Sequence, residues 1–404
     1  TIFFFFLNIQ AQIPSWNWAW GLGGEEVDQI DLLVVDSAGN VYVMGVFKSS
    51  SVVIGSTGYT ASTNAPRSFF LKFSPQGQLL WQKVYPANVQ CTAFSLGKHQ
   101  EIYLFGLFYG IFYIGPYSLN SGTAVTRNFV AQLDSNSAVV WVNDEILNTN
   151  GTFFEYYAPH PTDGLLMIGA SSYADTLGSI PIPEKSKYLV HMSRAGEIMK
   201  VVQLGGWGVT NDTLSEYNSS ITFRDITVTP QGAVYIGGET RKYPQINTQV
   251  WQLPPLNYEN QYDYMSEVFV AKFDSSLQFE WARVSNASIY PGNGYGSLRM
   301  GGLHAMPDES LVMGCSGGSY PLYFDSLEIG PSIIDLAYDN GFAVKYSPNG
   351  EVKWGKRFSP TDGLSQVNAL CGDGLGNTYV CLYGGEFAFP DQPNIQNFVV
   401  SKID

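Results

Sequence analysis

Residues that could do metal or acid–base chemistry are few in this chain and lie far apart in the sequence. Histidine occurs at four positions, and no two histidines, and no histidine with a cysteine, have the spacing of a metal site. The four are His99, His160, His191 and His304. The chain also has no G-x-S-x-G elbow, P-loop or complete calcium-loop motif. The sequence therefore predicts no metal centre, no cofactor and no assigned catalytic residue.

The longest segment between two predicted strands, Glu239–Glu267, is rich in aromatic residues and proline. Its aromatic residues include Tyr243, Trp251, Tyr258, Tyr262 and Tyr264. Long insertions on a regular scaffold often carry function, and exposed rings stack on sugars or hold peptides. We expect these five residues to be the ligand-binding candidates, with Trp251 and Tyr262 contributing to any site. The alternative interpretation is a self-packed loop that covers an apolar edge.

The four cysteines show no C-x-x-C pair and no disulfide framework spacing. They are Cys91, Cys315, Cys371 and Cys381. The last two align with apolar strand positions of other repeats, so we predict buried free thiols. Cys371 and Cys381 flank one predicted hairpin as a diagonal pair, which does not favour a disulfide.

Charge and the N-terminal segment bear on the location of the protein. The net charge of −14 at pH 7 disfavours nucleic acid and anionic membranes as partners. Residues 1–11 are apolar up to the small Ala11, which resembles the end of a secretory signal peptide; a buried first strand is the alternative. No segment is long and apolar enough to predict a membrane span. We expect a monomer that is secreted or held at the cell surface.

The elements that must position these residues are repeats. A strand that ends in glycine stands at Val41–Gly45 and recurs at Ile102–Gly106, Leu165–Gly169, Val234–Gly238, Ser310–Gly314 and, without the glycine, Thr378–Leu382. A strand–turn–strand module has tryptophan seven residues after a Ser or Asp. It stands at Phe69–Trp81, Phe129–Trp141, Phe269–Trp281 and Phe342–Trp354, with Lys200 in place of tryptophan in Tyr188–Lys200 and no second strand after Val399–Asp404. Internal repetition of this kind indicates one structural unit written six times.

Each repeat predicts four strands, which in the first copy are Ile30–Val35, Val41–Gly45, Phe69–Phe73 and a strand around Trp81. Two turns rich in Asp, Ser, Gly and Asn separate them. We call Asp36–Asn40 the first turn and Ser74–Gly77 the second turn, and we use these names in every repeat. His99 and His160 fall in first turns, and His191 is predicted to be an exposed residue of a third strand. The turns also explain the recurring Asp36, Asp134, Asp274 and Asp373 without a metal.

Short aromatic and β-branched strands between such turns predict an all-β fold. Four strands in a repeated unit are typical of a propeller. We therefore expect one six-bladed β-propeller domain over residues 12–404, with four-stranded antiparallel blades.

The repeat resembles that of the secreted bacterial β-propeller repeat family, often called SBBP repeats. That unit reads roughly D-x-x-G-N-x-Y-x-x-G, then a short F-G-like pair, then F-[VL]-x-K-[FL]-[DS]-x-x-G-x-x-x-W. The first repeat matches almost throughout, with Ile54-Gly55 at the F-G-like pair. The third repeat departs most, with Lys200 for the tryptophan and His160–Gly164 for the first turn. The resemblance implies a propeller scaffold without a shared catalytic motif.

The sixth repeat lacks its fourth strand at the C-terminus, and the N-terminal Trp18–Gly23 reads like Trp81–Pro86. We expect Ser15–Leu22 to pair antiparallel with Val399–Asp404. This pairing would close the ring and bury Trp18, because an open ring leaves backbone groups of an edge strand unpaired.

The sequence favours a binding scaffold for a protein or glycan ligand, without catalysis. Two alternatives stay open. One is a glycan hydrolase or lyase at the central channel, which would need Asp, Glu, His or Arg residues from several blades at one mouth. The other is a structural or adhesin module of a larger surface protein.

Overall fold

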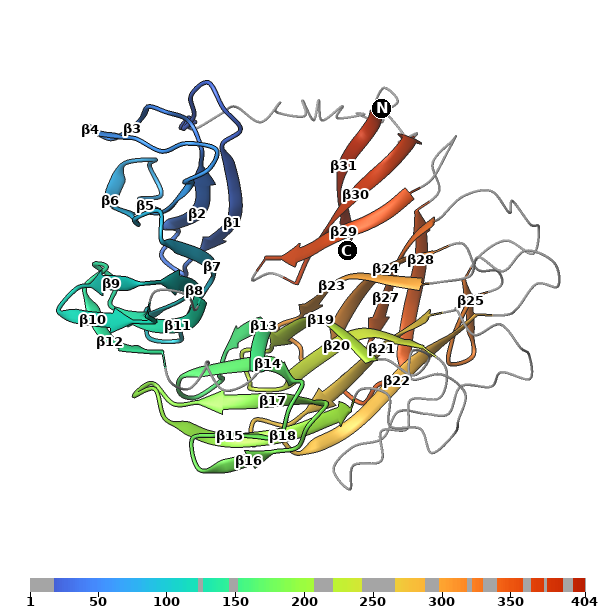
Figure 1. The fold of residues 1–404 in the computed structure, drawn as a ribbon. Helices are drawn as coiled ribbons and strands as arrows, with labels where there is room; N and C mark the ends of the chain where they lie inside the picture. Colours follow the sequence, from blue (N-terminus) through green and yellow to red (C-terminus); the bar gives the residue numbers. More distant parts are fainter. Residues whose placement is uncertain are drawn as a thin grey trace, which may run out of the picture. The chain divides into compact units, whose positions relative to one another are not determined.

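The computed structural model describes residues 18–122, 126–144, 152–206, 221–241, 266–287, 298–317, 322–329, 340–358, 365–373, 376–387 and 395–403. Every regular element in these ranges is a β-strand (Figure 1). A search of the same residues for a helix able to cross a membrane finds none.

The described strands form the six repeated antiparallel sheets that the sequence predicts, which we number as blades in chain order. Blade 1 contains β1 (Gln29–Val35), β2 (Val41–Phe47), β5 (Arg67–Phe73) and β6 (Leu79–Val84). Blade 2 contains β7 (Val89–Leu96), β8 (Ile102–Tyr109), β11 (Thr126–Leu133) and β12 (Val139–Asn143). Blade 3 contains β13 (Thr152–Pro159), β14 (Leu165–Ser171), β17 (Ser186–Met192) and β18 (Ile198–Gly206).

The later blades repeat this order. Blade 4 contains β19 (Ile221–Val228), β20 (Val234–Arg241), β21 (Ser266–Phe273) and β22 (Phe279–Ala287). Blade 5 contains β23 (Leu298–Ala305), β24 (Leu311–Gly317), β27 (Asn340–Tyr346) and β28 (Val352–Phe358). Blade 6 contains β29 (Ser365–Gly372), β30 (Thr378–Phe387) and β31 (Ile395–Ile403). The fold is an all-β, six-bladed β-propeller, as predicted.

Four short hairpins lie between the second and third strands of blades 1, 2, 3 and 5. They are β3 (Val52–Ile54) with β4 (Thr57–Tyr59), β9 (Ile111–Ile114) with β10 (Tyr117–Asn120), β15 (Asp175–Leu177) with β16 (Ile180–Ile182), and β25 (Leu322–Phe324) with β26 (Leu327–Ile329). Their turns require positive φ, which Gly55, Gly115 and Gly178 adopt readily and Asp325 adopts at 51°. The pair Ile54-Gly55 of the predicted repeat is therefore the start of such a hairpin turn.

Two sheets differ from the predicted four strands. Blade 4 continues into the hairpin of the next repeat, because β25 pairs with β22 through Ser285 and Phe324, which makes a six-stranded sheet. The hairpin covers the outer edge of blade 4, where backbone groups would otherwise stay unpaired. In blade 6 the described residues supply three strands.

The predicted strand pairing at the N-terminus is not formed by Trp18–Leu22. These residues are not a strand, and β31 pairs with β30 in the described sheet. Residues 15–17 and Asp404 lie outside the described part of the chain. The physical reason is that Trp18 is held by blade 1: its indole stacks on Phe73 with ring centroids 5.9 Å apart, and its N–H donates to the Pro75 carbonyl at 3.0 Å.

Tryptophans of the fourth strands make the same kind of contact with the next blade. Trp141 Nε1 donates to the Arg194 carbonyl at 2.8 Å, and Trp281 Nε1 donates to the Pro348 carbonyl at 2.9 Å. Each acceptor is the second residue of a second turn. Trp18 therefore makes the same contact with the second turn of blade 1 that Trp141 makes with blade 3 and Trp281 makes with blade 5.

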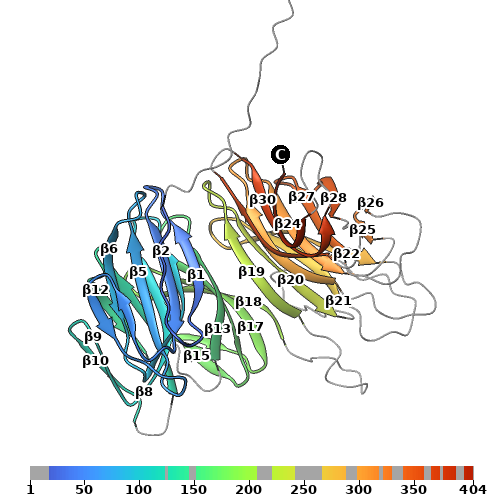
Figure 2. The same cartoon turned by 90° about the horizontal axis from the view of Figure 1, so that it is seen from above.

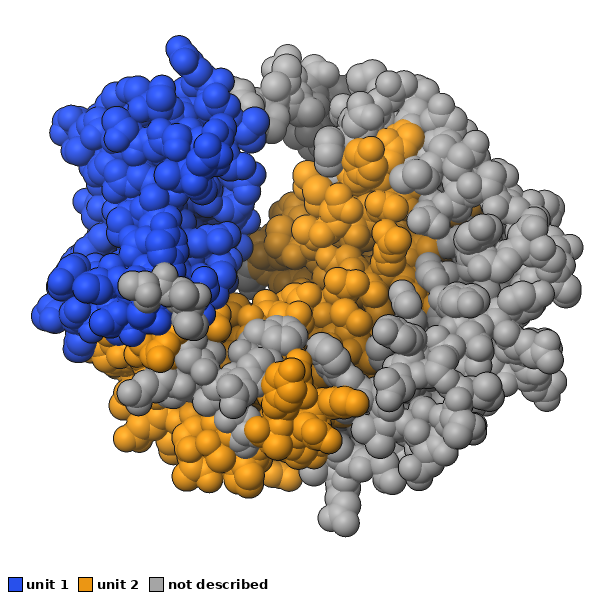
Figure 3. Space-filling model, viewed as in Figure 1, with its two compact units in different colours: residues 1–94, 104–126, 136–138 blue, residues 95–103, 127–135, 139–404 orange. Residues whose placement is uncertain are grey.

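The second and third strands are buried on both faces, as the core of a blade requires. In β5 the residues Ser68–Phe73 are all buried, and every described residue of β14 is buried. The chain divides into two compact units, residues 1–94, 104–126 and 136–138, and residues 95–103, 127–135 and 139–404 (Figure 3). The first unit has a core around Val43, Phe69 and Leu71. That residues 12–404 form one domain stays a prediction.

In the second unit the first strands of successive blades are neighbours: β13 contacts β19 (Figures 1 and 2), β19 contacts β23, and β23 contacts β29 (Figure 1). Apolar clusters fill the space between these blades. One joins Ile236 and Phe269 of blade 4 to Leu189 of blade 3. Another joins Tyr235 of blade 4 to Met313 of blade 5.

All four cysteines are free, as predicted. Cys91 and Cys315 are buried, and burial raises the pKa of both thiols. Cys381 is half-buried, but Cys371 is exposed, so the prediction of burial was wrong there. It lies on β29 opposite Tyr379, at the end of the strand next to the first turn.

Candidate binding site

The aromatic candidates Tyr243, Trp251, Tyr258, Tyr262 and Tyr264 lie outside the described residues. The neighbouring strands β20 and β21 end at Arg241 and begin at Ser266. The prediction that this segment binds a ligand stays a prediction.

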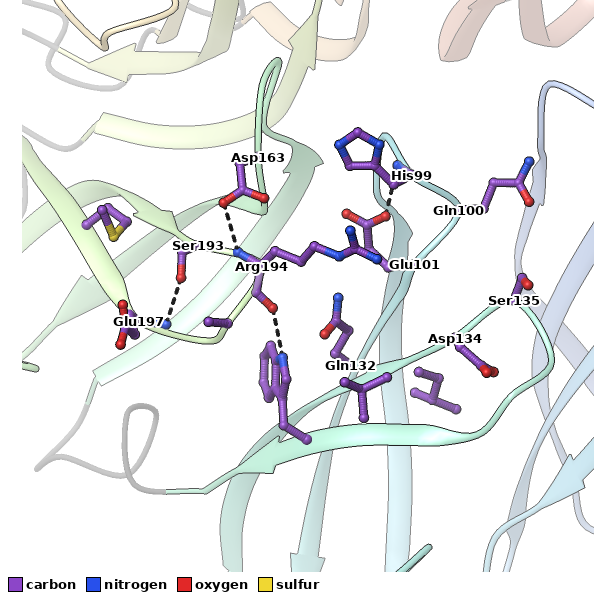
Figure 4. A pocket seen from close by; sticks show the side chains of 15 residues that line it. His99, Gln100, Glu101, Gln132, Asp134, Ser135, Asp163, Ser193, Arg194 and Glu197 are labelled. Carbon is purple, nitrogen blue, oxygen red and sulfur yellow. Dashed lines mark hydrogen bonds between the residues drawn. The ribbon is translucent and has the colours of Figure 1, made fainter.

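The structure instead brings polar residues together around a cavity of about 940 Å³ in the second unit (Figure 4). Its walls are the first and second turns of blades 2 and 3 and the start of strand β12. The charged residues in the lining are Glu101, Asp134, Asp163, Arg194 and Glu197. His99, Gln132 and Trp141 lie beside them.

The wall from blade 2 is built around Glu101, whose side chain is buried. Its carboxylate accepts from the His99 backbone N–H at 2.8 Å and from the Tyr103 hydroxyl at 3.5 Å. In blade 1 the residue at the start of the first turn makes equivalent hydrogen bonds: the Asp36 carboxylate accepts from the Asn40 N–H and from the Tyr42 hydroxyl. In blade 2 the first turn starts with Gly97, which has no side chain, so the carboxylate comes from Glu101 at the other end of the turn.

The Tyr103 hydroxyl lies close to several charged groups of the cavity. Burial raises the pKa of Tyr103 above its usual value, the nearby Glu101 and Asp163 carboxylates raise it further, and Arg194 lowers it. These charged groups therefore lie close enough to act on one phenol, and the Arg194 side chain points toward Glu101 in Figure 4.

The wall from blade 3 is held by backbone contacts. The Arg194 N–H donates to the Asp163 carboxylate at 3.4 Å, while the Arg194 carbonyl accepts from Trp141. The Glu197 N–H donates to the Ser193 hydroxyl at 3.2 Å, as the equivalent Glu351 does with Ser347 in blade 5. The side chains of Arg194 and Glu197 are exposed to the cavity.

Behind Asp163 two histidines stack on each other. The rings of His160 and His191 have centroids 3.6 Å apart and planes 6° apart. His160 is buried, whereas His191 is half-buried, so the prediction of an exposed His191 was wrong. The reason is the stack, together with a hydrogen bond from His191 Nε2 to the Asp163 carbonyl at 2.8 Å.

Both histidines are held neutral. Burial, then the neighbouring His191, lowers the pKa of His160 to about 4, and the Asp163 carboxylate opposes the shift. Burial also lowers the pKa of His191, against the hydrogen bond to Asp163. A neutral ring can accept at one nitrogen and donate at the other. His160 accepts from the Asp163 N–H at Nδ1, and His191 donates to the Asp163 carbonyl from Nε2.

No sequence motif predicts this pair of histidines, because His160 and His191 are far apart in the chain and do not have the spacing of metal ligands. One signal was present: the third repeat departs most from the pattern, and His160, His191 and Lys200 are among its departures. Among the described residues, no group of three His, Cys, Asp or Glu side chains is arranged so that it could hold a metal ion.

Comparison with known proteins identifies no family. No family model and no curated protein matches the chain. Among solved structures it is similar to a polysaccharide lyase described as a PL25 ulvan lyase, at 9% identity and a TM-score of 0.45, over 91% of this chain and 79% of that one. A protein of unknown function from Bacteroides caccae has 9% identity and a TM-score of 0.36 over 78% of each chain. At these values the likenesses carry no argument about function.

Proposed function

We propose that this protein is a non-catalytic binding propeller whose ligand enters the cavity between the turns of blades 2 and 3. The observation that carries this proposal is the lining itself. Four carboxylates and one guanidinium surround a cavity of about 940 Å³, at the upper end of the usual size range for small-molecule sites. Gln132 adds an amide to this polar wall.

The charge of the lining selects the ligand class. Glu101, Asp134, Asp163 and Glu197 outweigh Arg194, so the wall is acceptor-rich and negative. Sugar hydroxyls and ammonium groups donate to carboxylates, whereas carboxylated or sulfated sugars would be repelled. We therefore propose a short neutral or amino-bearing oligosaccharide as the ligand.

Two of the four lining carboxylates are engaged within the turns, which favours binding over hydrolysis. A glycosidase needs one carboxyl as general acid and a second as base or nucleophile. Glu101 is occupied by the turn and by Tyr103, and Asp163 by the Arg194 N–H. Both groups are thus fixed as parts of the turns that shape the cavity.

The test begins with a glycan and peptide array at pH 7.5, followed by calorimetry on the glycans that bind. Glu197→Gln should weaken binding about tenfold or more, because it removes an exposed acceptor charge without touching the core. The matched control is Glu351→Gln, which makes the same change directly after the second turn of blade 5 and should leave binding unchanged.

Three outcomes would overturn the proposal. The array could bind no glycan, the two variants could weaken binding equally, or the bound oligosaccharide could be cleaved. Binding of basic peptides alone would favour a protein ligand for the same negative wall, and cleavage would favour the enzyme alternative.

A secreted or cell-surface location belongs to this proposal and is supported by the apolar N-terminal residues 1–11. Antibody labelling of intact producing cells and of their medium tests it. Detection confined to lysed cells would contradict it.

A further inference from the structure

The first turn of blade 3 is capped by an imidazole where blades 1 and 6 use a carboxylate. In blade 1 Asp36 accepts from the backbone N–H groups of Ala38 and Asn40, both at 2.9 Å. Asp373 accepts from the Asn377 N–H in blade 6. In blade 3 the residue at this place is His160.

The His160 Nδ1 atom takes over the accepting role. The backbone N–H groups of Thr162 and Asp163 each donate to it at 3.3 Å, and the Thr162 hydroxyl lies 3.1 Å away. Backbone N–H groups can only donate, so Nδ1 must be unprotonated and the ring proton sits on Nε2. The other ring nitrogen bonds to the backbone of Ser275 in the second turn of blade 4.

A proton on His160 would therefore break this cap, which an ionised aspartate would keep. It would place an N–H against two N–H donors, and a second proton on His191 would set two cations 3.6 Å apart. The turn that would be released contains Asp163, whose carbonyl accepts from His191 and whose carboxylate accepts from the Arg194 N–H. Both Asp163 and Arg194 line the cavity.

The charges around the stacked pair come from every element packed on it. Asp163 favours protonation of both rings, and Lys200 on β18 opposes protonation of His191. Lys98, in the first turn of blade 2, donates to the Pro161 carbonyl at 2.8 Å. The Arg194 backbone N–H donates to the Asp163 carboxylate. Burial lowers the pKa of both rings, Lys200 adds to that effect at His191, and the Asp163 carboxylate opposes it, so two further positive charges are disfavoured.

We propose that His160 and His191 form an acid-operated latch that holds the first turn of blade 3 and, with it, one wall of the cavity. At neutral pH the latch is closed and the wall is ordered. On acidification the opened turn takes up protons and stays open, so the ligand is released. The use of this latch in ligand release rests on the proposed binding function, whereas the latch itself does not.

Hydrogen–deuterium exchange of the whole protein without ligand tests the latch directly. Opening exposes His160 to water, where its pKa is about 6.5, against about 4 in the closed turn. Linkage then predicts that protection of the Thr162 and Asp163 amides falls about fiftyfold between pH 7.5 and pH 4.5, after correction for intrinsic exchange rates. The amides of Ala38 and Asn40, which the Asp36 carboxylate caps, should change much less: burial raises the pKa of Asp36, but the hydrogen bonds that it accepts lower it by more.

Two variants make the test specific. His160→Asp restores the cap of blades 1 and 6 and should keep protection at pH 4.5. His191→Gln places there the residue that blade 2 has at Gln132 and should reduce the pH effect while keeping a donor for the Asp163 carbonyl. If the wild type loses no protection at pH 4.5, or if His160→Asp loses as much as the wild type, the latch does not exist.

Ligand binding is then measured at both pH values. A latch confirmed by exchange, with no glycan bound at pH 7.5, would overturn the proposed function alone. Glycan binding that is equally strong at pH 7.5 and 4.5 would overturn the release role. Binding that weakens at pH 4.5 in the wild type and persists in His160→Asp is the expected result.

Discussion

The Trp281 indole lies over Gly350 so closely that a Cβ added to this glycine would fall 2.8 Å from the ring. The same tryptophan donates to the Pro348 carbonyl two residues earlier. Trp18 stands in the same relation to Gly77, at 2.6 Å, and Trp141 to Gly196, at 3.3 Å. In each case a tryptophan is thus fitted to a glycine of a second turn, and Trp141 and Trp281 come from the fourth strand of the preceding blade.

Replacing this glycine should destabilise the junction through two separate effects. Gly350→Ala puts a side chain at φ of +80° and drives Cβ into the Trp281 ring, so we expect a loss of about 2–3 kcal/mol in unfolding free energy. Denaturant unfolding measures it. Gly110→Ala is the matched control: its φ is +69° with open space around it, so it should cost about 1 kcal/mol. Equal losses would show that the ring contact contributes nothing.

Lys200 stands where repeats 1, 2, 4 and 5 have tryptophan, and Leu277 stands where the second turns of blades 1, 3 and 5 have glycine. Leu277 is buried. Instead of an indole N–H, the Lys200 ammonium group donates a hydrogen bond to this turn, at the Ser276 carbonyl. Lys200→Trp should therefore destabilise by about 1–3 kcal/mol, although it restores the repeat. Adding Leu277→Gly should offset part of that loss in a double-mutant cycle, by about 1 kcal/mol. A stabilised Lys200→Trp single variant would contradict the fit between these positions.

Trp18 should stabilise blade 1 although it is not in a strand. Trp18→Ala removes the stack on Phe73 and the bond to Pro75, so we expect a loss of about 2 kcal/mol for this half-buried ring. Trp18→Phe keeps an aromatic ring and should lose about 1 kcal/mol, the value of the hydrogen bond. Both are read from urea midpoints. An unchanged midpoint for Trp18→Ala would refute the anchoring role.

Asp225 should make stability depend on pH in the opposite sense to the histidines. Burial raises its pKa to about 6, against hydrogen bonds from the Leu303 and Ile226 N–H groups. Because the folded protein holds this proton more tightly, the stability contribution is present at pH 4 and is lost as pH rises to about 6. His160, with its lowered pKa, loses stability as pH falls from about 6.5 toward 4.

The difference between wild type and Asp225→Asn isolates this carboxyl. The wild type should lose about 1–3 kcal/mol relative to the variant between pH 4 and pH 7, since one pKa unit corresponds to about 1.4 kcal/mol. Thermal or urea unfolding of both proteins at each pH gives the difference, in which the histidine contributions cancel. A difference that is flat with pH would contradict the raised pKa.

The sequence by itself determined the elements of this protein. Strand ends, turn residues and the tryptophan spacing are local properties, so β2 and β5 lie where Val41–Gly45 and Phe69–Phe73 predict them. The turn caps are local as well, because Asp36 bonds to N–H groups within four residues of itself.

Only the tertiary structure decided which residues from different repeats meet. The stacking of His160 on His191 depends on the register of β14 against β17, and the lining of the cavity depends on how blade 3 packs against blade 2. The β25–β26 hairpin joins the preceding blade, a pairing that its own residues do not encode. Cys371 is exposed although its repeat position is apolar. A repeated pattern specifies the faces of each strand, whereas contacts between repeats depend on side chains that differ from one copy to the next.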